Sequence, residues 1–207
     1  MMKTDGGIDK STKGAIIINV AQKRFGLYGL RKTSMQDIAD DLKLSKASLY
    51  YYFPDKESLY RAVFEKEQTE FISKISERIM SIQEPEQLLL EYVNARLTYF
   101  RTLLNLSRLR FEEYSDLKPV FMETIRIFKE NETKIVRNIF EKGIRMGKFS
   151  IKDPDVTASL FLDILKGLRI SVVNDKKMLV IEQKEFEQLR KNTISFTEIF
   201  INGLKFK

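Results

Sequence analysis

The sequence contains no cysteine and no histidine among its 207 residues. Their absence excludes disulfides, cysteine nucleophiles, zinc sites built from Cys and His, and histidine general bases. A metal site made only of carboxylates, or acid–base chemistry by a carboxylate pair, stays possible in principle, but no arrangement of residues favours either. We therefore expect a protein that is not an enzyme and that uses no metal or other cofactor.

The sequence also lacks an apolar run long enough to cross a membrane. Its most apolar stretch, residues 156–173, is interrupted by Asp163, Lys166 and Arg169 and falls short of about 18 uninterrupted apolar residues. The N-terminal stretch MMKTDGGIDK has no apolar h-region, so residues 1–11 are expected to form a disordered tail and not a signal peptide. These features predict a cytoplasmic protein without a membrane partner.

Proline is scarce, and the pattern between the four prolines is helical. Apolar residues recur at intervals of three and four, whereas the period-two pattern of strands is absent. A first helix is expected over about 12–27, ended by Gly29 at the position that favours a left-handed residue. The fold class predicted from this pattern is all-α.

Capping signals divide the next part of the chain into short helices. Thr33 and Gln36 fit a capping box, Ser45 is a good N-cap, and Pro54 forces the third helix to stop after about eight residues. Asp55 then caps a longer helix that is expected to reach about residue 82. Two short helices joined by a turn and flanked by two others form the frame of a helix-turn-helix, whose second helix enters the DNA major groove.

The chain is basic, with a net charge of +7 and a pI near 9.4. Residues 1–56 hold ten Lys/Arg and six Asp/Glu, so positive charge is denser there than in the rest of the chain. This charge permits binding to nucleic acid or to an anionic membrane surface without deciding between them.

The third expected helix carries three consecutive tyrosines beside lysine. Helical geometry puts Leu49 and Phe53 on one face, directed into the small domain's core. The opposite face presents positive, small and phenolic groups that suit a groove and its phosphates. The alternative is that the tyrosines are core filler and the lysines ordinary solvated charges. The residues on this outer face are Lys46, Ala47, Tyr50 and Tyr51, with Tyr52 angularly between the two faces.

The segment from Ile17 to Leu59 resembles the DNA-binding domain of the tetracycline-repressor (TetR) family of bacterial transcription regulators. The resemblance rests on IINVA (17–21), TSMQDIA (33–39) and SKASLYYYFPDKESL (45–59). It implies base contacts by Lys46, Ala47 and Tyr51. It implies phosphate contacts by Thr33, Ser45, Ser48, Tyr50, Tyr52 and Lys56. Lys43, included in the DNA-binding set, stands where the family usually has glycine, so it either accepts a strained left-handed backbone or changes the turn.

The remaining residues predict a larger helical domain. We expect a helix-turn-helix domain over 12–54, a connecting helix over 55–82, and a helical effector-binding and dimerisation domain over 83–207. The resemblance implies a pocket for a small-molecule effector, whose identity the sequence does not disclose. The residues proposed to line that pocket are Tyr92, Arg96, Phe100, Phe121 and Phe161.

The last two expected helices are apolar on more than one face. Their apolar surface is wider than a helix needs to pack against a single core. The resemblance implies that they form a homodimeric four-helix interface, and a two-fold dimer suits a palindromic DNA site. The alternative is that both helices are central in a monomeric bundle. The interface residues predicted from the pattern are Phe161, Leu165, Leu168, Phe196 and Phe200.

Three functions are considered for this sequence: a ligand-responsive transcriptional repressor, a helical adaptor that binds a protein or an acidic membrane surface, and a helical enzyme. Only the first accounts for caps, Lys/Ser/Tyr and a terminating proline at helix-turn-helix spacing. The adaptor predicts no DNA binding, and the enzyme requires acid–base groups that the sequence scarcely offers.

Overall fold

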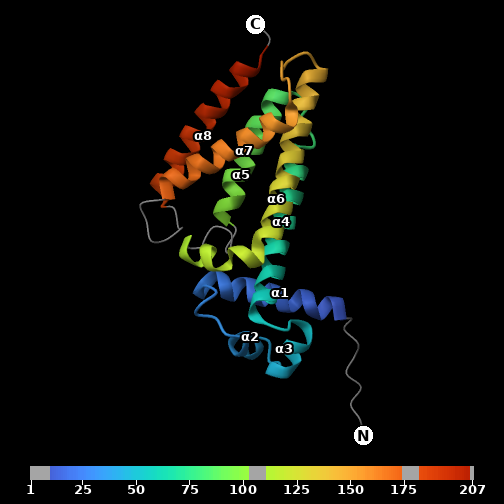
Figure 1. Ribbon diagram of the computed structural model, residues 1–207, viewed down its shortest axis with the longest axis vertical. Coiled ribbons are helices and arrows are strands. Elements are labelled where there is room, and N and C mark those ends of the chain that lie inside the picture. The colour runs from blue at the N-terminus through green and yellow to red at the C-terminus, as the bar shows by residue number, and fades with distance from the viewer. Residues whose placement is uncertain (1–9, 103–110, 174–181, 206–207) are drawn as a thin grey trace. The chain divides into compact units, whose positions relative to one another are not determined.

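The computed structural model describes residues 10–102, 111–173 and 182–205. Every regular element within these ranges is an α-helix, which confirms the all-α prediction. The helices are α1 (Lys10–Tyr28), α2 (Met35–Asp41), α3 (Lys46–Tyr52), α4 (Lys56–Ile79), α5 (Pro85–Thr102), α6 (Phe111–Arg145), α7 (Pro154–Val173) and α8 (Gln183–Leu204), in the order shown in Figure 1. Of the disordered tail predicted for residues 1–11, residues 1–9 lie outside the described ranges, and Lys10 and Ser11 already belong to α1.

The chain divides into two compact units, and the division falls within α4, between Glu67 and Gln68. The N-terminal unit contains α1 to α3 and the first part of α4. Its core includes Ile17, Phe25, Ile38 and Leu49, all nearly inaccessible to solvent. The Phe25 ring also packs edge-on against Tyr60 at 5.0 Å between ring centroids. One apolar cluster thus holds α1, α2, α3 and the start of α4 together.

The signals that end and begin these helices act largely as the sequence predicted. Gly29 has a φ of 82° and donates its N–H to the Phe25 carbonyl at 2.8 Å, so it ends α1. Ser45 caps α3, since its hydroxyl accepts the Ser48 N–H at 3.1 Å. The Asp55 carboxylate accepts the Ser58 N–H at 2.6 Å at the start of α4. This hydrogen bond lowers the pKa of Asp55, because it favours the charged carboxylate.

The predicted capping box of α2 was wrong by one residue. Ser34, not Thr33, is the N-cap: its hydroxyl accepts the Asp37 N–H at 3.1 Å, and the Asp37 carboxylate accepts the Ser34 N–H at 2.8 Å. Gln36 instead donates to Asp40 at 2.7 Å. Both Thr33–Gln36 and Ser34–Asp37 have the spacing of a capping box. The helix begins after Ser34 because the side chain of Thr33 points into the protein.

Helices α5 to α8 form the C-terminal unit together with the rest of α4. Their contacts form a closed ring, in which α5 packs on α6, α6 on α7, α7 on α8, and α8 on α5. Leu89, Val93, Phe140 and Phe161 are fully buried inside this bundle. None of the helices in the described ranges is long and apolar enough to cross a membrane, and no group of three or more acidic residues there could hold a metal ion.

Candidate DNA-binding surface

The turn between α2 and α3 has the geometry that a helix-turn-helix needs, although it lacks the usual glycine. Lys43 takes a left-handed φ of 54°. Its N–H donates to the Asp40 carbonyl at 3.0 Å, and the Leu44 N–H donates to the Ala39 carbonyl at 2.9 Å, which together close the end of α2. Of the two alternatives for Lys43, the structure therefore has the strained left-handed backbone, at a cost of about 1–2 kcal/mol.

Helix α3 presents most of the predicted contact residues to solvent. Leu49 is fully buried and anchors the helix, while Tyr51 on the opposite face is 68% exposed. The Lys46 ammonium lies 5.9 Å from the centre of the Tyr50 ring, and the rings of Tyr51 and Tyr52 meet edge-on at 5.2 Å. The surface thus combines a positive charge, a small methyl group and phenolic hydroxyls. Its exposed members are Ser45, Lys46, Ala47, Tyr50 and Tyr51; Ser48 and Tyr52 are half-buried.

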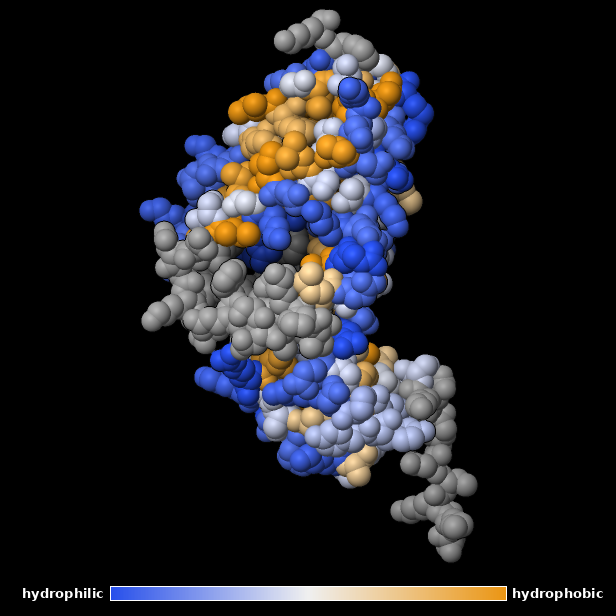
Figure 2. Space-filling view, viewed as in Figure 1, coloured by the Kyte–Doolittle hydropathy of each residue, from blue (hydrophilic) through white to orange (hydrophobic). Residues whose placement is uncertain are grey.

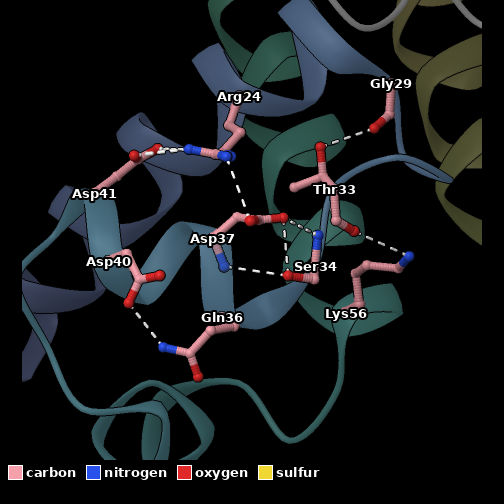
Figure 3. Close-up of polar contacts among 9 residues, drawn as sticks. All are labelled: Arg24, Gly29, Thr33, Ser34, Gln36, Asp37, Asp40, Asp41 and Lys56. Carbon is pink, nitrogen blue, oxygen red and sulfur yellow. Dashed lines mark hydrogen bonds and ion pairs between the residues drawn. The ribbon is translucent and has the colours of Figure 1, made fainter.

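Two predicted phosphate contacts have other partners in this structure. Thr33 is 1% exposed, and its hydroxyl donates to the Gly29 carbonyl at 2.8 Å, so it faces its own protein and not a ligand. The Lys56 ammonium donates to the Leu30 carbonyl at 3.0 Å and to the Thr33 carbonyl at 3.1 Å. Figure 3 shows Lys56 and Thr33 in this arrangement. Lys56 therefore fixes the α1–α2 loop on α4, with one ammonium proton left for a phosphate.

We expect the substitution Lys56→Met to lower the free energy of unfolding by about 1.5–3 kcal/mol, because it removes two hydrogen bonds from a charged donor but keeps most of the aliphatic stem. Lys23→Met, an exposed position on α1, serves as the control and should change stability by less than about 0.5 kcal/mol. Urea denaturation checks both. Equal stabilities for the two variants would show that Lys56 serves only ligand contact.

Sequence reasoning missed Arg24, which neutralises the acidic face of α2. Its guanidinium binds both oxygens of Asp41 at 2.7 and 2.6 Å and lies 3.5 Å from Asp37 (Figure 3). The hydrogen bond to Asp41 raises the pKa of Arg24, while hydrogen bonds from Ser34 lower the pKa of Asp37. Two carboxylates beside a phosphate-binding surface would repel DNA, so the arginine improves the electrostatics as well as the packing. The S-x-x-D spacing could have revealed Ser34 and Asp37, but no local pattern reveals Arg24.

In the C-terminal unit, the residues predicted to line the effector pocket do not share one environment. Tyr92 and Arg96 share a buried hydrogen-bond network with Glu132, a residue that the sequence analysis did not select. Phe161 lies instead in an aromatic cluster with rings of α6 and α8, at 4.8 Å from Phe200 between centroids. The side chains of Phe100 and Phe121 lie outside those that the structure describes.

The five residues predicted for the dimer interface differ in their exposure to solvent, and the prediction was wrong for two of them. Phe161 is fully buried and Leu165 nearly so within a single chain, so neither forms a surface that a second chain could contact. Leu168, Phe196 and Phe200 are half-buried. The sequence showed that α7 is apolar on more than one face but could not show which face the bundle covers.

The two short helices, the glycine-free left-handed turn and the exposed basic, tyrosine-rich α3 define a helix-turn-helix protein. Comparison with known proteins makes the class specific. Residues 17–63 match the family model described as bacterial regulatory proteins, tetR family. A crystal structure of a transcriptional regulator from Cytophaga hutchinsonii is 38% identical to this chain, with 94% of this chain and 99% of that one covered and a TM-score of 0.81. The chain belongs to the TetR family of DNA-binding transcriptional regulators.

Two further relatives have lower sequence identity. The uncharacterized HTH-type regulator YhgD of Bacillus subtilis is 24% identical over 74% of this chain and 80% of its own length. A transcriptional regulator from Saccharomonospora viridis, solved in complex with choline, has a TM-score of 0.72 at 18% identity, with 91% of this chain and 96% of that one covered. That second likeness concerns the fold alone.

Proposed function

We propose that this protein is a ligand-responsive repressor that binds a palindromic operator as a homodimer on the bacterial nucleoid. The observation that carries the proposal is the outer face of α3, where Lys46, Ala47, Tyr50 and Tyr51 are exposed around the buried anchor Leu49. Packing of the domain core does not require the large or charged side chains of Lys46, Tyr50 and Tyr51 to face solvent. A DNA major groove, in contrast, can accommodate all three.

The side chains are assigned by their exposure and chemistry. Lys46 and Tyr51 are proposed to reach base edges, and Ala47 to contact a thymine methyl group. The hydroxyls of Ser45, Ser48, Tyr50 and Tyr52 and the ammonium of Lys56 are proposed to bind phosphates, which position the helix. Lys43, exposed in the turn, adds charge close to the backbone. Ser34 replaces Thr33 in this set because its hydroxyl lies on the exposed start of α2.

The outer face of α7 supports the dimer. Val156, Leu160, Gly167 and Ile170 follow one another at intervals of four, seven and three, so they share one exposed face. Ile199 of α8, a helix that packs against α7, is also exposed, and Figure 2 shows apolar residues gathered over these two helices. Large exposed apolar patches on soluble domains commonly mark interfaces.

Gly167 adds an independent argument for close helix contact. It lies inside α7, where glycine costs about 1 kcal/mol relative to alanine. A Cβ atom at this position would meet nothing within 4 Å in its own chain, so packing inside the protomer does not require glycine. A second copy approaching the α7 backbone would require it. We therefore place the interface on the outer faces of α7 and α8, with the half-buried Leu168, Phe196 and Phe200 at its edge.

DNA binding by α3 is tested with the DNA upstream of the protein's own gene, by fluorescence anisotropy. Tyr50→Phe should weaken binding by about 1 kcal/mol without unfolding the protein, because it removes only a phosphate-binding hydroxyl. Lys46→Ala should reduce affinity mainly for operators that keep the base pair it reads, whereas loss of a phosphate contact affects all sequences alike. A wild-type protein that binds this DNA no better than random DNA would favour an adaptor function instead.

A further inference from the structure

The exposed side of α7 carries a charged residue at its centre. Successive residues of an α-helix are rotated by about 100°, so the position of each residue around α7 follows from its number. All exposed residues between 155 and 171 fall within less than half of the helix circumference, and Asp163 lies in the middle of this arc. Phe161 and Leu165 occupy the opposite side and are buried. The residues of the proposed dimer surface around Asp163 are Val156, Leu160, Gly167 and Ile170.

Lys129 of α6 forms an ion pair with Asp163 of the neighbouring helix α7. Its ammonium donates to both oxygens of the Asp163 carboxylate, at 3.0 and 3.2 Å. The side chains of Lys129 and Asp163 are 51% and 54% exposed. An ion pair with this exposure adds little to the stability of a single chain, because water weakens the attraction and the lysine side chain loses freedom. Stability of the protomer therefore does not explain a charge at this position.

The surroundings of this ion pair change when a second copy covers α7. A two-fold dimer places the same surface of each chain against its copy, so the centre of the exposed side is covered in both chains. Gly167 lies one turn after Asp163, and a Cβ atom there would meet nothing within 4 Å in its own chain, so the backbone is open to another helix. Association thus removes water from the pair. Loss of either partner would then leave a buried charge uncompensated.

The ion pair also distinguishes between partner surfaces. An ammonium has three N–H donors and a carboxylate accepts about four hydrogen bonds, so polar groups remain after Lys129 and Asp163 bind each other. In the single chain both side chains are exposed enough for water to satisfy these groups. In a complex they need polar atoms from the partner, and a purely apolar surface supplies none. A second copy brings the same polar groups to the same centre by symmetry.

We propose that the Lys129–Asp163 ion pair is a specificity determinant of the homodimer. It is covered when two copies associate, and it opposes association with surfaces that lack matching polar groups. The inference rests on the proposed dimer and extends its interface to α6, the helix that carries Lys129. Asp163, which interrupts the most apolar stretch of the sequence, thereby has a function that the interior of the protomer does not require.

The substitution Lys129→Met in the full-length protein tests whether the pair is covered. It should raise the dimer dissociation constant at least about 100-fold, because it leaves the Asp163 carboxylate buried and unpaired. If the pair stays in water, the same substitution only makes the surface more apolar, and the constant should change by about fivefold at most. Adding Asp163→Leu to Lys129→Met should restore the constant to within about tenfold of wild type, since apolar residues then replace the pair as a unit. Sedimentation equilibrium measures all three proteins.

Lys148→Met is the matched control. Lys148 lies 3.9 Å from Glu84, outside α7 and α8, and the two side chains are 49% and 50% exposed. Loss of this lysine should change the dissociation constant by less than about fivefold. Circular dichroism checks that every variant keeps its helices. A change below fivefold for Lys129→Met, or a double variant that dimerises no better than Lys129→Met alone, overturns the proposal.

Subunit exchange tests the selectivity. Isotope-labelled wild type is mixed with the unlabelled double variant Lys129→Met/Asp163→Leu, and native mass spectrometry counts the dimers. Random exchange makes half of them mixed. The mixed dimer covers the wild-type ion pair with an apolar centre, so its share should fall well below half. A random mixture overturns the role of the pair in specificity.

The wild-type protein separates this proposal from the proposed function. If wild type dimerises and Lys129→Met leaves the dimer unchanged, the assignment of the ion pair is wrong and the homodimer stands. If wild type is a monomer at concentrations that saturate its operator, the proposed homodimer fails and the ion-pair proposal fails with it.

Discussion

Ile199→Glu and Leu160→Glu should each convert the proposed dimer into a folded monomer. Ile199 is 72% exposed and Leu160 is 55% exposed in the single chain, so a glutamate at either position does not disturb the protomer. In the proposed interface the same carboxylate is buried without a partner, which costs about 3–5 kcal/mol. The dimer dissociation constant should therefore rise by at least about 100-fold, since 1.4 kcal/mol corresponds to a factor of ten.

Loss of the dimer should also reduce operator affinity by a large factor, because a monomer binds one half-site where the dimer binds two. Sedimentation equilibrium and fluorescence anisotropy measure the two effects, and circular dichroism checks that the helices remain. Met80→Glu is the matched control, because Met80 is 79% exposed on the turn after α4, outside α7 and α8. Unchanged dimers in both interface variants would remove α7 and α8 from the interface.

Phe161→Ala should instead destabilise the protomer, although Phe161 is adjacent to Leu160 in sequence. The Phe161 ring is fully buried and packs against three other phenylalanines, at 6.2 Å from Phe140, 5.9 Å from Phe196 and 4.8 Å from Phe200 between centroids. Truncation of a buried phenylalanine removes these contacts and leaves a cavity. We expect the free energy of unfolding to fall by about 3–5 kcal/mol.

This measurement is made by urea denaturation in the monomeric Ile199→Glu background, so that dimer dissociation does not contribute. The control is Leu160→Ala in the same background, which should change stability by less than about 0.5 kcal/mol because the side chain is exposed. If the two alanine variants lose equal stability, the assignment of Phe161 to the interior and of Leu160 to the surface is wrong.

A second glycine, Gly143 of α6, shows how packing inside the protomer restricts the residue type near the phenylalanine cluster around Phe161. A Cβ atom on Gly143 of α6 would lie 2.0 Å from the Phe149 ring, which is fully buried. Glycine at this position therefore serves packing inside the chain, in contrast to Gly167, where space is open. Both glycines lie in helical sequence, and no local pattern distinguishes their roles.

The sequence by itself determined the elements whose causes are local. Ser45 and Asp55 cap helices as their positions predicted, and Gly29 ends α1, because a cap depends on hydrogen bonds to backbone groups within a few residues. The alternation of the buried Leu49 with the exposed Tyr50 and Tyr51 likewise follows from the helical period. The helix-turn-helix and its outward-facing residues were therefore predictable.

Tertiary structure alone decided the features that depend on residues far apart in the chain. Lys56 binds carbonyls that precede it by 23 and 26 residues. Arg96 meets Glu132 across 36 residues. On α7 the apolar pattern covers more than one face, and only packing against α6 and α8 determines that Phe161 is inside and Leu160 outside. Periodicity gives the angle between side chains around a helix, but the direction of the core is set by the neighbouring helices.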